Sequence, residues 1–272
     1  MAVVAAAAEG PGDGEFVISL ARGLTVIRSF SEERPQQTLS ELAAVTGLSR
    51  AVVRRFVHTL VALGYARRVG PDGTAGADGK LFALTPRVLE LGFSYLSSQP
   101  LPEIVQPHLE RLSREVGESV STAILAGPDV VYVARVPTRR IMRVGITIGT
   151  RFPAFVTSMG RVLLADLSAD ERARVLAQSE LEAFTERTIV DPAVLNAELD
   201  RVHAQGWALV DGELEVGLRS IAVPVHRRDG SVAAAVNLST SATQVTHDQV
   251  IDELLPRLRE TAAAIDADLA LV

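Results

Sequence analysis

A row of cations on one predicted helix is the clearest chemical feature of this sequence. Arg50, Arg54 and His58 recur every four residues, with Arg55 beside them, so they share one face of a helix over residues 50–63. An arginine fork matches the two acceptors that guanine presents in the major groove, and neighbouring cations bind phosphates. The pattern predicts a DNA-binding surface. Because runs of charge are usually only solvated surface, the adjoining elements must show whether this face binds DNA.

Local signals predict the helices that would position this face. Thr38 and Glu41 have the spacing of a capping box and start a short helix, and Gly47 suits its left-handed end. Ser49 then caps the cationic helix. The apolar stripe of that helix consists of Val53, Phe56, Val57, Leu60 and Leu63. Two helices this close have helix-turn-helix spacing, in which the second helix enters the major groove.

The flanking segments predict a winged module. YARRV and KLFAL are expected to be two short strands joined by the loop PDGTAGADG. Arg67, Arg68 and Lys80 would then face the phosphate backbone. Upstream, residues 16–30 predict a first helix with Arg22 and Arg28 off its apolar stripe. That stripe consists of Leu20, Leu24, Ile27 and Phe30.

The charge of the chain is divided between its two parts. The whole chain carries −6, but residues 16–98 contain ten Lys and Arg against six Asp and Glu, whereas residues 99–272 contain seventeen against twenty-four. This asymmetry is expected when one end of a protein meets phosphate. Residues 1–15 are rich in Ala and Gly without Lys or Arg, which predicts a disordered tail and not a secretory signal.

Composition also excludes several kinds of site. The chain has no cysteine, so disulfides, zinc-thiolate sites and cysteine nucleophiles are ruled out. No apolar run approaches the ~20 residues that span a bilayer. We therefore expect a cytoplasmic protein without cofactors.

The rest of the chain predicts a second, α+β domain. Thr85 and Pro86 start a linker helix over residues 86–99. Residues 103–116 predict a helix that Pro107 must kink or begin. β-Branched runs (SVSTAILA, VVYVARV and RRIMRVGITIG) predict an antiparallel meander, and further strands and capped helices follow. We expect a disordered tail (1–15), a winged helix-turn-helix domain (16–85), the linker helix (86–99) and a domain of antiparallel sheet and helices (100–272).

An enzyme with a nucleic-acid-binding appendage is the rival interpretation. The five histidines have no metal-ligand spacing: His58, His108, His203, His226 and His247. Walker, G-x-S-x-G and dinucleotide motifs are absent. Glu213 and Glu215 lie in one loop, which is more typical of a solvated turn than of an acid/base pair. We therefore predict no catalytic and no metal site.

Several motifs in order along the chain resemble the IclR family of bacterial transcriptional regulators, from about Phe16 to Leu269. They are SLARGLTVIRSF, LSELAAVTGLSRAVVRRFVHTLVALGY, LTPRVLELG, GTRFPAFVTSMGRVLLA and GWALVDGELEVGLRSIAVPV. With YVARVPTRRIMRV, they are most similar to the subgroup regulating protocatechuate and β-ketoadipate pathway genes. The resemblance implies a winged helix-turn-helix domain, a GAF-like effector domain and dimers or dimers of dimers. The implied partners are operator DNA, a small carboxylate effector and, as a further candidate, RNA polymerase.

The predicted site residues combine these arguments. The predicted DNA contacts are Arg22, Thr38, Ser40, Ser49, Arg50, Arg54, Arg55, His58, Arg68 and Lys80. The start of a helix at Ser158, Met159 and Gly160 offers free N–H groups to a carboxylate. The resemblance adds Ser220, Asn237, Ser239 and Asp211, with Phe152 and Val144 as apolar walls.

Other interpretations stay open beside this one. The cations Arg135, Arg139, Arg140 and Arg143 are a second choice for the carboxylate. The effector could be a small acid of another catabolic pathway, and a constitutive DNA binder would have a closed, empty effector pocket.

Overall fold

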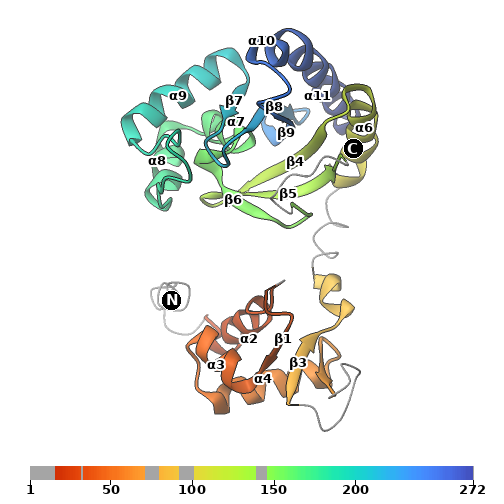
Figure 1. The fold of residues 1–272 in the computed structure, drawn as a ribbon, viewed down its shortest axis with the longest axis vertical. Helices are drawn as coiled ribbons and strands as arrows, with labels where there is room; N and C mark the ends of the chain where they lie inside the picture. The colour runs from red at the N-terminus through yellow and green to blue at the C-terminus, as the bar shows by residue number, and fades with distance from the viewer. Residues whose placement is uncertain (1–15, 32, 71–79, 92–100, 139–145, 272) are drawn as a thin grey trace. The chain divides into compact units, whose positions relative to one another are not determined.

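The computed structural model describes residues 16–31, 33–70, 80–91, 101–138 and 146–271. The chain divides into two compact units, Met1–Ser97 and Ser98–Val272 (Figure 1). Each unit has its own hydrophobic core, so each is described separately.

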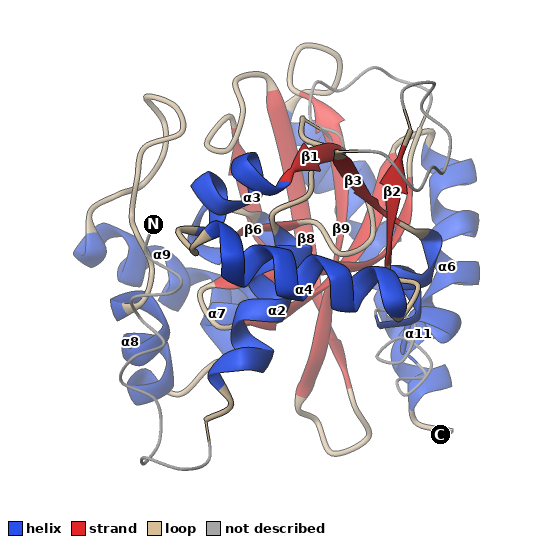
Figure 2. Cartoon of the chain, turned by 90° about the horizontal axis from the view of Figure 1, so that it is seen from below, coloured by secondary structure: helices blue, strands red, loops and turns tan. Residues whose placement is uncertain are grey.

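The described part of unit 1 is a winged module of three α-helices and a small sheet, as predicted. Its helices are α2 (Ile18–Arg28), α3 (Leu39–Thr46) and α4 (Arg50–Ala62). Its sheet has the antiparallel order β1 (Gln36–Thr38), β3 (Leu81–Leu84), β2 (Ala66–Val69). Figure 2 shows α4 running between α2 and α3. The capping box of Thr38 and Glu41 and the left-handed Gly47 delimit α3 as the sequence predicts.

The predicted stripe of α2 is partly wrong. Leu20 and Leu24 are 63% and 46% exposed, whereas Val26 is fully buried. Ile27 and Phe30 do pack on the core of the unit. The core of unit 1 therefore covers only the end of α2, and the apolar side chains at the start of α2 remain exposed.

The predicted linker helix lies largely outside the described residues. Its start is present, because Thr85 caps the short 3-10 helix Pro86–Val88 with proline in its first turn. Arg87 donates from Nη1 to the Leu63 carbonyl at 3.0 Å, which ties this segment to the end of α4.

Unit 2 is built on a six-stranded antiparallel sheet. The strand order is β6 (Arg151–Pro153), β5 (Asp129–Val136), β4 (Ser119–Ala126), β9 (Val232–Ser241), β8 (Leu218–His226), β7 (Ala208–Asp211). The predicted third strand of the meander falls partly on residues 139–145, outside the described part. Residues 146–150 are loop and turn, and β6 follows them.

Helices cover both faces of this sheet (Figure 1). One face packs against α7 (Ser158–Asp166) and α9 (Pro192–Gln205), beside which α8 (Ala169–Ala177) lies. The other face packs against α6 (Leu101–Val116) and α11 (Leu255–Leu269). Before α11, Thr246 and Gln249 form the predicted capping box of the short α10 (His247–Gln249). Because α6 begins at Leu101, Pro107 lies inside the helix and does not start it.

Candidate functional site

The first candidate surface is the cationic face of α4. Arg50, Arg54 and Arg55 are exposed, while Val53, Val57 and Leu60 on the opposite side are buried. Ser49 caps the helix by accepting from the Val52 N–H at 3.4 Å. These three residues fix α4 in the core and leave the three guanidinium groups in solvent. Leu63 of the predicted stripe follows the end of α4 and is 53% exposed, so that part of the prediction is wrong.

Two of the predicted DNA contacts, Arg68 and His58, lie next to each other where the wing meets α4. Arg68 Nη2 on β2 lies 3.4 Å from His58 Nε2 on α4, and its guanidinium carbon is 5.7 Å from the Phe82 ring centroid. These contacts orient both side chains at the junction of α4 and the sheet. Lys80 is exposed at the described end of the wing, and the wing loop 71–79 lies outside the described residues.

The remaining predicted DNA contacts have different surroundings. Arg22 and Ser40 are exposed. The Thr38 hydroxyl is engaged, because it donates to Glu41 Oε2 at 2.8 Å and accepts from the Glu41 N–H at 3.2 Å. Hydrogen bonds from the Thr38 amide and hydroxyl hold the pKa of Glu41 below its usual value. The amide and the hydroxyl of Thr38 therefore both donate to Glu41 and cap α3, so Thr38 has no donor left for a phosphate in this arrangement.

The second candidate site is a buried polar cluster in unit 2. Ser158 Oγ and Ser220 Oγ are 2.8 Å apart, although they lie 62 positions apart in the sequence. Asn237 donates from Nδ2 to Ser220 Oγ at 2.9 Å and to Ser239 Oγ at 3.1 Å. Ser239 donates to Ser220 at 3.2 Å. All four side chains are at most 8% exposed, so four of the predicted ligand contacts meet in one place.

Strand alternation explains why these groups meet. Ser220 lies opposite Ser239, and Asn237 opposite Ser121, so all four share the face covered by α7. Val236 and Leu238 alternate with them and point to the other face, against α6 and α11. Hence the cluster interrupts an otherwise apolar layer.

Arg135 extends the cluster along the same face. It lies opposite Ser121 on β5 and donates from Nη1 to Ser121 Oγ at 2.9 Å. Burial lowers the pKa of Arg135, and burial raises the pKa of the neighbouring Tyr132 to about 12, so that phenol stays protonated. Sequence reasoning ranked this arginine second, although the alternation of β4 and β5 could have placed it beside Asn237.

Two polar atoms near this layer lack partners. Asn237 Oδ1 and Arg135 Nε are buried, and neither has a hydrogen-bond partner within the described residues. The first turn of α7 adds unpaired donors: the Gly160 N–H is taken by Thr157 Oγ1 at 3.0 Å, but the N–H groups of Ser158 and Met159 have no acceptor in the described part. Buried polar groups are costly unless paired, which suits a site completed by a ligand.

The other predicted ligand contacts have structural roles as well. Met159 is fully buried in the core, and Phe152 packs on that core with its ring 5.9 Å from Tyr132. Gly160 approaches the backbone of Ala154 so closely that a Cβ would lie 2.0 Å from its carbonyl oxygen. Val144 lies outside the described residues.

Asp211 belongs to an ion-pair network at the edge of the sheet. Arg219 donates to it from Nε at 3.2 Å and from Nη2 at 3.0 Å, and Arg187 donates from Nη1 at 3.0 Å. Hydrogen bonding to Arg219 is the main cause that lowers the pKa of Asp211 below its usual 3.8. Asp211 thus orders the strand ends next to Ser220.

This pKa shift predicts a pH dependence of stability. The Asp211 carboxylate should stabilise the fold above pH 3.8 and lose that contribution as pH falls through its lowered folded pKa. Urea unfolding should show Asp211→Asn to be less stable than the parent at pH 7, with the difference shrinking towards pH 3. A constant difference across this range would contradict the assignment.

The prediction of a solvated turn at Glu213 is wrong. Glu213 is only 7% exposed and accepts from Arg161 Nη2 at 2.5 Å. Arg161 is 1% exposed and was missed by sequence reasoning, because nothing local in the sequence links it to a carboxylate 52 positions away.

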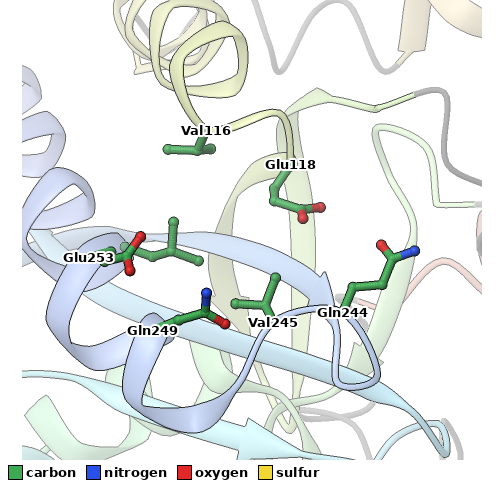
Figure 3. Close-up of a pocket in the computed structure, with 7 residues that line it drawn as sticks. Val116, Glu118, Gln244, Val245, Gln249 and Glu253 are labelled. Carbon is green, nitrogen blue, oxygen red and sulfur yellow. The ribbon is translucent and has the colours of Figure 1, made fainter.

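A separate cavity of about 350 Å³ lies at the corner of α6, α10 and the residues that follow β9 (Figure 3). It is lined by Val116, Glu118, Gln244, Val245, Gln249, Glu253 and Leu254. None of these is a predicted ligand contact. Val245 links it to the Asp211 network, since its carbonyl accepts from Arg219 Nη1 at 2.6 Å.

Within the described part of the chain, no three His, Cys, Asp or Glu side chains gather as a metal site would require. No helix in the same ranges has the length and apolar character needed to cross a membrane.

The chain is similar to known transcriptional regulators. The model of the IclR helix-turn-helix domain matches residues 19–70, and that of the bacterial transcriptional regulator IclR C-terminal domain matches residues 93–267. The Pca regulon regulatory protein of Pseudomonas putida is 44% identical over 91% of this chain and 82% of its own length. The p-hydroxybenzoate hydroxylase transcriptional activator of Acinetobacter baylyi is 35% identical over 91% and 90%.

A solved structure shares the fold. The crystal structure of an IclR homologue from Microbacterium hydrocarbonoxydans, complexed with 4-hydroxybenzoate, is 27% identical, with a TM-score of 0.79 over 93% of this chain and 100% of that one. Both domain models match in order, and the relatives are named regulators and not enzymes. The chain belongs to the IclR family of bacterial transcriptional regulators.

Proposed function

We propose that this regulator controls genes of aromatic-acid catabolism, and that a small aromatic carboxylate bound in unit 2 modulates its operator binding. The names of two relatives refer to the Pca regulon and to p-hydroxybenzoate hydroxylase, and a third relative was crystallised with 4-hydroxybenzoate. These names supply the ligand class. The chemistry of the buried polar cluster supports it independently.

On the DNA side, the proposal assigns base reading to Arg50 and Arg54. Both are exposed in the first two turns of α4, the part of a recognition helix that faces base edges. The proposed contacts to the phosphate backbone are Arg55, His58, Arg68, Lys80, Arg22, Ser40 and Ser49. Thr38 instead positions the start of α3 through its capping box with Glu41. A regulator of this kind acts on the bacterial chromosome, so we place it in the cytoplasm.

The observation that carries the effector site is the unpaired Asn237 Oδ1 inside a hydrogen-bonded serine cluster. Asn237 Nδ2 and Ser239 donate to Ser220, so Ser220 can donate to Ser158. The Ser158 hydroxyl then remains to donate outward, together with the N–H groups at the start of α7. These donors suit a carboxylate, while Asn237 Oδ1 needs a donor such as a phenolic hydroxyl.

Arg135 is the second candidate for the carboxylate. Its Nε is buried and unpaired within the described residues, and burial lowers its pKa, so an anion would relieve the cost of its desolvation. A ligand that reaches both Arg135 and Ser158 would bridge β5 and α7. Phe152 and Met159 would supply apolar surface for the ring.

Regulation requires an oligomer with two arrangements that bind the effector unequally. Apolar side chains are exposed on and just before α2: Leu20 and Leu24 on the helix are 63% and 46% exposed, and Phe16 before it is 42% exposed. Such a stripe supports self-association, and we propose a homodimer or a dimer of dimers. Residues 86–99 between the winged domain (16–85) and the effector domain (100–272) would transmit the change, and RNA polymerase is a candidate partner at the promoter.

Calorimetry of the full chain against 4-hydroxybenzoate, protocatechuate and β-ketoadipate tests the proposal. Binding of the two hydroxylated acids and weaker binding of β-ketoadipate are expected, because β-ketoadipate has no hydroxyl for Asn237. Binding of a non-aromatic acid instead would favour another catabolic pathway. Absence of heat with all three would favour a constitutive DNA binder.

The Ser220→Ala variant tests the cluster itself. Removing the hydroxyl on which Ser158, Asn237 and Ser239 converge should raise the Kd of the effector roughly tenfold, since a buried donor loses its acceptor at a cost of about 1–3 kcal/mol. DNA affinity without effector should stay unchanged. Ser231→Ala, in the exposed turn between β8 and β9, is the matched control. An unchanged Kd in Ser220→Ala would remove this cluster from the effector site.

A further inference from the structure

A buried ion pair joins α7 to the loop between β7 and β8. Arg161 Nη2 donates to Glu213 Oε2 at 2.5 Å, and its Nε donates to the Phe155 carbonyl at 3.0 Å. Glu213 Oε2 also accepts from the Ile189 N–H at 3.1 Å, and Arg161 Nη1 lies 3.9 Å from Glu198 Oε1. The Arg161 side chain therefore connects α7 to the 3-10 turn before it (Ala154–Val156), to the β7–β8 loop and to α9. Glu213 connects the same loop to residues 185–190.

Stability alone is a weak explanation for this arrangement. Removing two charges from water costs about as much as their attraction returns, and buried pairs can often be replaced by apolar residues of similar volume without loss of stability. Arg161 is nevertheless the largest fully buried side chain among the described residues. A buried ion pair can instead select one relative position of the segments it joins, where apolar side chains alone would allow several.

The pair stands directly beside the polar cluster. Ser158 lies one turn before Arg161 on α7, and Ser220 follows Glu213 by seven residues, after the same loop. The two hydroxyls that meet at 2.8 Å therefore belong to the two segments that the ion pair connects. Further bonds hold the loop from the other side, since Thr185 donates to the Gly212 carbonyl and Thr188 to that of Glu213, both at 2.7 Å.

We propose that Arg161 and Glu213 are positioning residues that hold the β7–β8 loop against α7 and so set the spacing of Ser158 and Ser220 on which effector affinity depends. This inference rests on the effector site proposed above. Neither residue contacts the effector. Because α7 is not part of the sheet, strand pairing alone does not fix its distance from the β7–β8 loop. The Arg161–Glu213 pair fixes that distance.

A double replacement separates positioning from stability. Arg161→Met with Glu213→Leu substitutes apolar side chains of similar volume and leaves neither partner of the pair buried alone, so the thermal midpoint should fall less than in Arg161→Met alone. It removes the acceptor of the Ile189 N–H and the donor to Phe155. The matched control is Leu258→Ala, a fully buried position of α11 on the opposite face of the sheet, which should lower the midpoint without touching the loop.

Hydrogen exchange of the effector-free protein gives the first measurement. In the double variant, amides of residues 212–220 and of Ile189 should exchange at least tenfold faster than in the parent, while amides of α6 and α11 keep their rates. In Leu258→Ala the acceleration should concentrate on α6 and α11. Equal rates over residues 212–220 in parent and double variant would overturn the inference whether or not the protein binds an acid.

Calorimetry with 4-hydroxybenzoate gives the second measurement. The Kd should rise about tenfold in the double variant. It should stay at the parent value in Leu258→Ala, although that control has a lower thermal midpoint than the parent. A parental Kd in the double variant would overturn the inference. If the parent itself binds none of the three acids, the proposed function fails, and the exchange rates alone decide whether the pair positions the loop.

Discussion

Replacing Gly160 with alanine is expected to abolish measurable effector binding and to destabilise unit 2 by about 3 kcal/mol. The new Cβ would lie 2.0 Å from the carbonyl oxygen of Ala154 and 2.4 Å from the Cα of Ala154. Both are backbone atoms that cannot rotate away, so α7 must move from the 3-10 turn Ala154–Val156. That movement displaces Ser158, which lies two positions earlier in the same turn, from Ser220.

Thermal unfolding and calorimetry of the Gly160→Ala variant measure the two effects. For a unit of this size the midpoint should fall by roughly 6–12 °C. Gly23→Ala is the control, since its Cβ would make ordinary contact with the Phe56 ring at 3.7 Å and alanine favours a helix such as α2. A parental midpoint and Kd in Gly160→Ala would mean that the two segments are not held as closely as described.

Features encoded by neighbouring residues were predictable from the sequence. The capping boxes at Thr38, Ser168 and Thr246 formed as their spacing indicated, because each requires only a hydroxyl and a carboxylate or amide three residues later. Alternation placed Asn237 and Ser239 on one face of β9 for the same reason. Local geometry determines such features, whatever the rest of the chain does.

Features that depend on distant partners were not predictable. Leu20 and Leu24 have the spacing of a buried stripe, yet the described part of unit 1 leaves them exposed, because α3 and α4 cover only part of α2. Glu213 has the local sequence of a surface turn, yet Arg161 draws it into the core. In both cases burial is decided by which segment lies opposite, and one sequence contains no local signal for that pairing.

The two proposed sites differ in how many segments of the chain build them. The base-reading surface proposed here needs only one helix with cations on one side and an apolar stripe on the other, and α4 presents both. The proposed effector site instead takes Ser158 from α7, Ser220 from β8 and Asn237 from β9. A site assembled from three segments changes when any one of them moves, which suits a domain whose ligand must alter its arrangement.

Replacing Arg54 with alanine is expected to weaken operator binding by about 1–3 kcal/mol, roughly 5- to 150-fold. Arg54 is exposed in the second turn of α4, where a guanidinium can reach both acceptors of a guanine. Because the loss comes from one base pair, the variant should also lose its preference at that position. Its affinity for non-specific DNA should change much less. Binding titrations against a set of operators, each with one altered base pair, measure both quantities.

The salt dependence of the same titrations distinguishes base reading from phosphate contact. A phosphate contact would lower affinity equally for every sequence and reduce the slope of log K against log salt by about 0.9. Arg174→Ala on α8 of unit 2 is the control, since it removes the same charge from an exposed position outside the winged module. Loss of affinity in both variants would indicate a general charge effect, and uniform loss in Arg54→Ala alone would reassign Arg54 to the backbone. Only a loss confined to one operator position supports α4 as the helix that reads the bases.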